Sequence, residues 1–91
     1  MKRNLQALRD AGIRLARFSA RVDARGKTGA IGLRHVISPT GITGHAWVNA
    51  DEWHGQIPQK WDEVEFTASI RTYYKGNGVE DVGLFDVWVM E

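Results

Sequence analysis

The sequence contains no cysteine and only two prolines in 91 residues. Without cysteine the chain forms neither a disulfide framework nor a thiolate metal site, so its stability has to come from a hydrophobic core. Long apolar runs are also missing, and no stretch approaches the roughly 18 apolar residues of a membrane-spanning helix. The first residues mix polar and apolar side chains, unlike a secretory signal. The sequence therefore predicts a cytoplasmic protein without a membrane segment.

A large excess of one charge is missing too, because 12 Lys and Arg residues nearly balance 11 Asp and Glu residues. The basic residues are concentrated in residues 1–36, and the remainder of the chain is acidic. This distribution excludes an acidic mimic of DNA. It suits a nucleic-acid contact on one face, or an acidic protein partner. The plainer alternative is that these arginines are solvated side chains on the outside of strands and a helix.

The composition is that of one small globular domain, with an apolar fraction of 43% and a charged fraction of 25%. Four Trp, three Phe and two Tyr supply the large side chains that a core of this size needs. The chain shows no internal repeat, low-complexity tract or linker. We expect a helix within residues 1–12 and a single β domain in residues 13–91.

Hydrophobic periodicity predicts one short helix and five strands. Good helix formers with Leu5 and Leu8 three residues apart predict a helix that Gly12 ends. Alternating apolar and polar residues, together with aromatic and β-branched residues, predict the strands. These strands are expected at residues 15–25, 30–38, 43–50, 64–74 and 82–90.

Glycine-rich segments predict the turns at residues 25–29, 38–41 and 75–78. Residues 51–61 have neither period, so we expect a loop with at most one helical turn near Asp51. Three large apolar side chains are expected to hold this loop against the sheet: Trp53, Ile57 and Trp61.

The alternation also predicts which residues share a strand face. In the third strand, Ala46 and Val48 face one side, while His45, Trp47 and Asn49 face the other. The pattern leaves open which of these faces points inward, because Trp47 is also a good core residue. In the last strand one face is expected to hold Gly83, Phe85, Val87 and Val89, and the other Leu84, Asp86 and Trp88.

The order of elements predicts a mainly β fold, closed as a five-stranded OB-like barrel behind a short N-terminal helix. Hairpins join the first two and the last two strands, and a longer connection joins the third to the fourth, as in an OB barrel. Closure removes edge strands that promote aggregation. The alternatives are an SH3-like barrel and an open sheet packed on the helix. The helix is not needed for closure, so it either caps the barrel end or acts as an interaction arm.

Two segments carry a family resemblance. His45-Ala46-Trp47 lies in the third strand, and an acidic-apolar strand that begins at Trp61-Asp62 ends in Tyr73-Tyr74-Lys75-Gly76. This pattern resembles small OB-fold proteins of bacteriophages and mobile elements, over residues 15–91. The Gly-Asp that commonly opens the second segment is Trp61-Asp62 here. The resemblance implies a single-stranded nucleic-acid binder or an accessory phage factor.

No constellation of side chains points to catalysis or to a metal. His35, His45 and His54 have none of the spacings that preorganise metal ligands. Glu63 and Glu65 share a strand face, but no partner acid or base is implied, so a solvated stripe is expected. Because no Ser-His-Asp arrangement or phosphate-binding glycine loop is present, the sequence predicts a protein that is not an enzyme and holds no cofactor.

The strongest constellation is aromatic and basic. In an OB barrel the second and third strands carry the nucleic-acid face, which the first-second and fourth-fifth loops border. Rings stack on bases there and cations follow the phosphates. For each ring, packing in the core is the alternative to stacking. The candidate nucleic-acid-binding residues are Arg25, Lys27, Arg34, His45, Trp47, Tyr73, Tyr74 and Lys75.

The sequence therefore predicts non-catalytic binding of single-stranded DNA or RNA. The alternative is a protein-binding accessory factor of a phage that inhibits a host protein, such as a defence nuclease. Small size, near-neutral charge and surplus aromatic residues support this alternative, because aromatic rings also anchor protein interfaces. A homodimer is compatible with either function.

Overall fold

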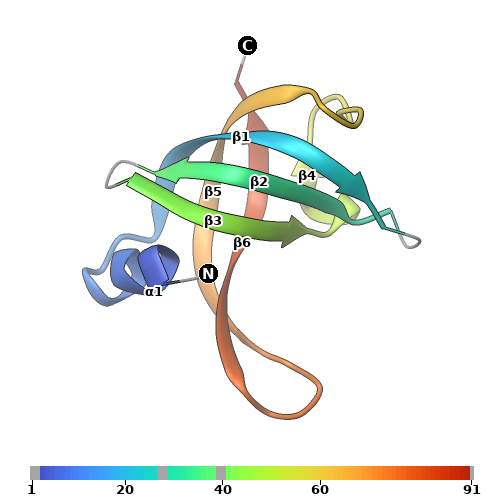
Figure 1. Cartoon of the computed structure of the whole chain (residues 1–91). Coiled ribbons are helices and arrows are strands. Elements are labelled where there is room, and N and C mark those ends of the chain that lie inside the picture. The colour runs from blue at the N-terminus through green and yellow to red at the C-terminus, as the bar shows by residue number, and fades with distance from the viewer. Residues whose placement is uncertain (1–2, 27–28, 39–40, 91) are drawn as a thin grey trace.

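The structure is a computed structural model that describes residues 3–26, 29–38 and 41–90 (Figure 1). Within these ranges the chain forms one α-helix, one 3-10 helix and six strands. The mainly β class expected from the sequence is confirmed. In chain order the elements are α1 (Arg3–Asp10), β1 (Leu15–Arg25), β2 (Ile31–Ser38), β3 (Gly41–Val48), η1 (Ala50–Glu52), β4 (Trp53–His54), β5 (Glu63–Tyr74) and β6 (Glu80–Val89).

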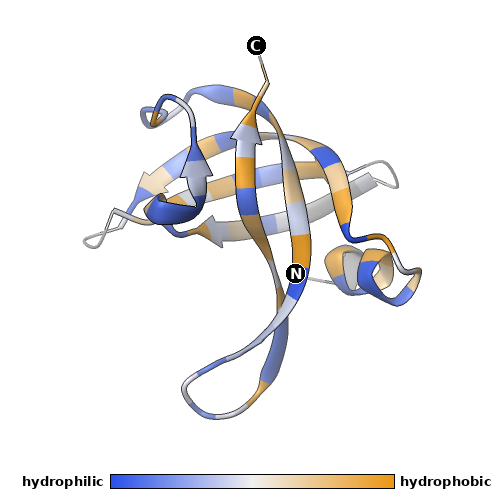
Figure 2. Ribbon diagram, turned by 180° about the vertical axis from the view of Figure 1, so that it is seen from behind, coloured by the Kyte–Doolittle hydropathy of each residue, from blue (hydrophilic) through white to orange (hydrophobic). Residues whose placement is uncertain are grey.

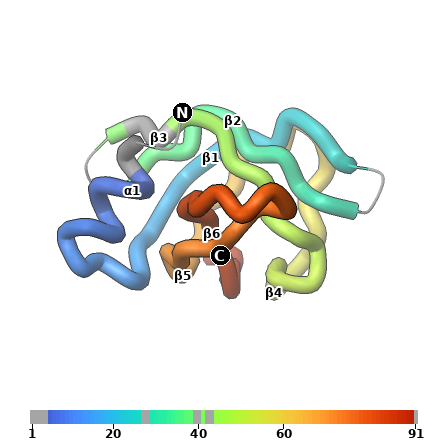
Figure 3. The backbone as a smooth tube through the Cα atoms, turned by 90° about the horizontal axis from the view of Figure 1, so that it is seen from below, coloured from blue at the N-terminus to red at the C-terminus, as the bar shows by residue number. Residues whose placement is uncertain are grey.

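Within the described residues, the strands form one sheet in the order β3-β2-β1-β5-β6-β4. Neighbouring strands are antiparallel, except that β4 pairs in parallel with β6. β1 is central because it pairs with β2 along one edge and with β5 along the other. The sheet curls, so β3 lies beside β6 (Figures 1 and 3).

Closure of the expected barrel is not confirmed. Over the described ranges the sheet remains open, because β3 contacts β6 without forming a hydrogen-bonded ladder with it. The strand count also differs from the five expected, because Trp53–His54 forms the additional strand β4. Two residues are too few to show a period of two, so the sequence pattern missed this strand. The helical turn expected near Asp51 is present as η1.

The core fills the inner side of the curled sheet. Phe18 of β1 stacks on its cross-strand partner Phe66 of β5, with ring centroids 5.6 Å apart. Buried and more exposed residues alternate along β1 and β5, which gives each of these strands one face for the core (Figure 2). The buried apolar residues that cluster with these two rings are Leu5, Leu8, Ala20, Val22, Ile31, Leu33, Val36, Ala46, Val48, Trp53, Ala68, Ile70, Val82, Leu84 and Val87.

Helix α1 belongs to this core. Leu5 and Leu8 lie on one helix face and are buried against the sheet. The helix ends as the sequence predicts: Gly12 has a φ of 82°, and the amides of Gly12 and Ile13 donate to the carbonyls of Arg9 and Leu8. These bonds satisfy carbonyl groups of the last turn, which have no partner within the helix.

Arg9 ties α1 to the β5–β6 hairpin. Its Nη1 donates to Glu80 Oε1 at 2.6 Å and to Thr72 Oγ1 at 3.1 Å. The hydrogen bond to the Glu80 carboxylate raises the pKa of the Arg9 guanidinium, against the smaller effect of desolvation; Asp10 raises it further. The guanidinium is therefore committed to holding the helix against the hairpin.

Strand β6 departs from the expected alternation at Asp86. Thr67 pairs with Trp88 and Ser69 pairs with Phe85, so β6 carries one more residue than β5 between these pairs. Asp86 has a φ of 51°. From this bulge on, each side chain of β6 points to the side opposite to the one that simple alternation predicts. Leu84 and Val87 both point into the core as a result. The prediction that Val87 shares a face with Phe85, and that Leu84 shares one with Asp86, is therefore wrong.

The loop between η1 and β5 is held by fewer apolar anchors than expected. Trp53 is buried, and its Nε1 donates to the carbonyl of Gln56 at 3.1 Å. Ile57 and Trp61 are exposed, so the prediction that they pin the loop is wrong. No helix among the described residues is long and apolar enough to cross a lipid bilayer.

The packing of α1 predicts a large effect of truncating its buried face. We expect Leu8→Ala to lower the free energy of unfolding by about 2–5 kcal/mol, because it leaves a cavity between helix and sheet. Leu15→Ala, which shortens an exposed leucine, should change it by less than about 0.5 kcal/mol. Urea unfolding followed by circular dichroism measures both. Equal effects of the two substitutions would show that α1 does not belong to the core.

Candidate functional site

The outer face of β3 presents an exposed indole. Ala46 and Val48 are buried, so His45 and Trp47 between and beside them point outward. This settles the orientation that the sequence pattern left open. Trp47 is 51% exposed, although it is one of the largest apolar side chains in the protein. An exposed ring of this size is available for contact with another molecule.

Gly32 of β2 makes room for this ring. It is the cross-strand partner of Trp47. A Cβ atom at position 32 would stand 3.2 Å from Trp47 Cη2 and 3.1 Å from Asp23 Oδ1. The indole of β3 and the carboxylate of β1 therefore occupy the space above β2 that a side chain would otherwise fill. The indole thus lies over the backbone of Gly32.

His45 joins these two side chains. Its Nε2 lies 3.2 Å from both carboxylate oxygens of Asp23, and because a carboxylate accepts hydrogen bonds, Nε2 is the donor. Its ring meets the Trp47 ring edge to face, with centroids 5.7 Å apart. Asp23, Gly32, His45 and Trp47 thus form one group across three strands, which we name the Trp47 cluster.

Two of the predicted cations lie on the same strands. Arg34 is exposed on β2, and its Nη2 lies 3.4 Å from Nε2 of His35. Arg25 ends β1 and donates to the carbonyl of Pro58 at 3.1 Å. Within the ranges that the structure describes, neither arginine forms an ion pair. Their positive charges are therefore uncompensated. The third predicted cation of this region, Lys27, lies outside the described residues.

Other arginines on the outer face are compensated. Arg17 and Arg21 of β1 form ion pairs at 2.6 Å with Glu65 and Glu63 of β5. Arg21 and both glutamates line an open groove of about 790 Å³, which His35 also borders. Because its charges are paired, this groove attracts a phosphate less than the region around Arg25 and Arg34.

Trp61 is a second exposed indole, which the sequence patterns did not assign to the site. It is 56% exposed, and Lys60 Nζ lies 5.0 Å from its ring centroid. Its φ of 76° is strained for a bulky residue. The conformation is held by Val22, whose carbonyl accepts from Trp61 N at 2.7 Å and whose amide donates to Asp62 O at 2.9 Å. The signal available in the sequence was a Lys-Trp pair in a segment without periodicity.

The β5–β6 hairpin carries a further aromatic group. Tyr73 and Phe85 meet edge to face, with centroids 5.9 Å apart, and Arg71 Cζ lies 5.6 Å from the Phe85 centroid. Gly83 again provides the space, since a Cβ atom there would stand only 2.9 Å from Tyr73 Cε1. We name Arg71, Tyr73, Gly83 and Phe85 the Phe85 cluster. Arg71 and Phe85 were not among the predicted site residues.

The predicted group of Tyr73, Tyr74 and Lys75 is divided in the structure. Tyr73 is half-buried, and its hydroxyl donates to Asp81 Oδ2 at 3.3 Å. Lys75 Nζ lies 3.3 Å from the same oxygen, so its charge is partly compensated. Tyr74 is exposed and follows Tyr73 on the strand, so it points to the opposite face. The three side chains therefore do not act on one surface.

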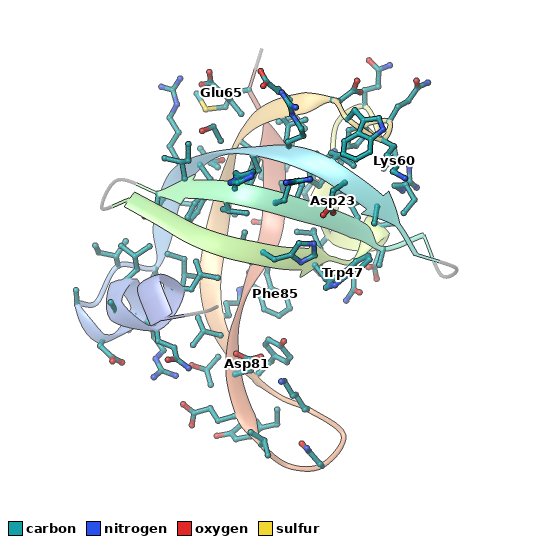
Figure 4. The ribbon with its side chains drawn as sticks, viewed as in Figure 1. Asp23, Trp47, Lys60, Glu65, Asp81 and Phe85 are labelled. Atoms are coloured by element: carbon teal, nitrogen blue, oxygen red, sulfur yellow. The ribbon has the colours of Figure 1, made fainter. Side chains whose placement is uncertain are left out.

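The Trp47 cluster, the Lys60–Trp61 pair and the Phe85 cluster lie along one side of the molecule. Figure 4 shows Lys60, Asp23, Trp47 and Phe85 in this order, from the loop before β5 to the β5–β6 hairpin. The strands that carry Trp47 and Phe85, β3 and β6, are in contact. We name this the aromatic-basic surface.

A separate aromatic pair lies beside β4, which is an edge of the sheet. Trp88 of β6 stacks on His54, with centroids 4.2 Å apart and an interplanar angle of 12°. Asp86 binds both rings, at 2.8 Å from His54 Nε2 and 3.2 Å from Trp88 Nε1. His35, His45 and His54 thus lie on three different strands. Among the described residues, no three His, Asp or Glu side chains converge as metal ligands would.

Comparison of the chain with protein-family models, curated proteins and solved structures gave no match.

Proposed function

We propose that the chain binds single-stranded nucleic acid on the aromatic-basic surface. The observation that carries the proposal is Trp47, an indole that is half exposed yet supported from below by Gly32. Its position is preset, so a base that stacks on it does not first have to order the ring. Each stacked base contributes about 1–3 kcal/mol to binding.

Uncompensated cations on the same surface support the proposal. Arg34 lies on β2, the strand next to that of Trp47, and Arg71 lies over Phe85. Arg25 lies at the end of β1, where it donates to the carbonyl of Pro58. Because no carboxylate of the described residues pairs with them, they attract phosphates without first breaking an ion pair. Proteins bind single strands with aromatic rings that stack on the bases and with cations that contact the phosphates.

A single strand fits this surface better than a duplex. In a duplex the base faces are stacked on one another, so an exposed indole has no base to contact. Single strands present unstacked bases to aromatic side chains. The surface also lies between the β1–β2 and β5–β6 hairpins, as it does in a partly open OB barrel. We accordingly propose an OB-like architecture for the five long strands.

Substitution of Trp47 tests stacking on this ring, and substitution of a second exposed tryptophan, Trp88, is the control. We expect Trp47→Ala to raise the Kd for a fluorescein-labelled oligothymidine about 5- to 150-fold, which corresponds to the loss of one stacked base. Trp88→Ala removes an indole that is 55% exposed but already stacked on His54, and we expect less than about a twofold change. Fluorescence anisotropy at low salt measures both variants.

Circular dichroism before each titration establishes that the variants are folded. If neither DNA nor RNA oligonucleotides bind at tens of micromolar protein, nucleic-acid binding is refuted. Equal losses in the two tryptophan variants would refute the assignment of Trp47 as the stacking residue. Protein binding stays the alternative prediction in either case.

Phosphate contact by Arg34 is tested through salt dependence. The slope of log Kd against log salt concentration reports the phosphates that the protein neutralises, at about 0.7 per contact for single strands. We expect Arg34→Ala to reduce the slope by about 0.7. Arg17→Ala should leave it nearly unchanged, because Arg17 is paired with Glu65. An unchanged slope in Arg34→Ala would exclude Arg34 from phosphate binding.

A further inference from the structure

A carboxylate lies in the middle of the aromatic-basic surface. Asp23 stands between the Lys60–Trp61 pair and Trp47 (Figure 4). Its side chain is 22% exposed, so part of the side chain reaches solvent. A negative charge there repels phosphates, so phosphate binding does not explain the residue. Its chemistry suits a group that donates hydrogen bonds.

Asp23 is held close to the ring on which a base would stack. A Cβ atom at Gly32 would stand about equally close to Asp23 Oδ1 and to Trp47 Cη2, at 3.1 and 3.2 Å. The carboxylate therefore lies at the edge of the indole, above the same glycine. A base that covers the indole has its own edge beside Asp23.

His45 fixes the orientation of this carboxylate. Its Nε2 is shared between Oδ1 and Oδ2 at 3.2 Å each. The imidazole is itself held against Trp47 by the edge-to-face contact. A carboxylate has about four acceptor positions, so one shared donor leaves both oxygens able to accept further bonds. Asp23 is a preoriented pair of acceptors.

We propose that Asp23 selects guanine as the base stacked on Trp47. Guanine has two adjacent donors, N1–H and the 2-amino group, which match the two oxygens of one carboxylate. Adenine and cytosine place a ring nitrogen acceptor beside their amino group, and thymine flanks its N–H with two carbonyls. These acceptors face the carboxylate unfavourably. The inference rests on the proposed nucleic-acid binding and names the base that this surface prefers.

The geometry also favours single strands for a second reason. The donor edge of guanine is occupied by cytosine in a duplex, so Asp23 reaches it only in an unpaired strand. A bidentate contact of this kind discriminates against the wrong base by about 5- to 150-fold. Loss of the 2-amino group, as in hypoxanthine, removes one of the two hydrogen bonds.

The experiment uses the full chain and oligothymidine probes that carry one central guanine, hypoxanthine, adenine or cytosine. We expect guanine to bind about 5- to 150-fold more tightly than adenine or cytosine, with hypoxanthine between them. Asp23→Asn should remove this preference, because an amide presents one donor and one acceptor group. Glu63→Gln, which neutralises an exposed acid on β5, should keep the preference.

The outcomes separate this inference from the proposed function. Binding of oligothymidine that depends on Trp47 but shows no base preference overturns the role of Asp23 and leaves the proposed function intact. A guanine preference that survives in Asp23→Asn also overturns it, as does equal binding of guanine and hypoxanthine. Failure of every probe to bind refutes both. The base comparison with the unaltered chain decides the preference even if Asp23→Asn does not fold.

Discussion

The pairing of β1 with both β2 and β5 is the constraint on which the rest of the structure depends. The inner side of β1 supplies Phe18, Ala20 and Val22 to the core. The next residue, Asp23, points to the outer side and belongs to the Trp47 cluster. The backbone of Val22 also holds the loop of Trp61 by two hydrogen bonds. A change in the register of this one strand would therefore displace the core and the candidate site together.

Glycines opposite aromatic residues shape the surface at two places. Gly32 leaves space for Trp47, and Gly83 leaves space for Tyr73 and Phe85. In both cases a ring covers backbone that lacks a side chain, which is a known way to stabilise glycine in a strand. Of these rings, Trp47 is still 51% exposed. This arrangement lowers the entropy that the protein would lose on binding a flat ligand.

Local patterns predicted the parts of the structure that depend on neighbouring residues. The alternation around Phe18 and Phe66 located β1 and β5, and Gly12 located the end of α1 through its positive φ. The patterns failed where one residue breaks the period. The bulge at Asp86 exchanged the faces of β6, and β4 is too short to have a period. Trp61 was predicted to hold the loop against the sheet, because no local sequence pattern indicates that a tryptophan is exposed.

The sequence by itself determined the class of the fold, the places of the helix and long strands, and the strands or strand ends of seven candidate residues: Arg25, Arg34, His45, Trp47, Tyr73, Tyr74 and Lys75. Tertiary structure alone decided which rings face solvent and which charges are paired. The reason is physical: exposure depends on how the sheet curls, and an ion pair such as Arg17–Glu65 or Lys75–Asp81 depends on cross-strand register or hairpin geometry. The approach of Asp23 to His45 and Trp47 across Gly32 joins three strands, and no local pattern in the chain contains it.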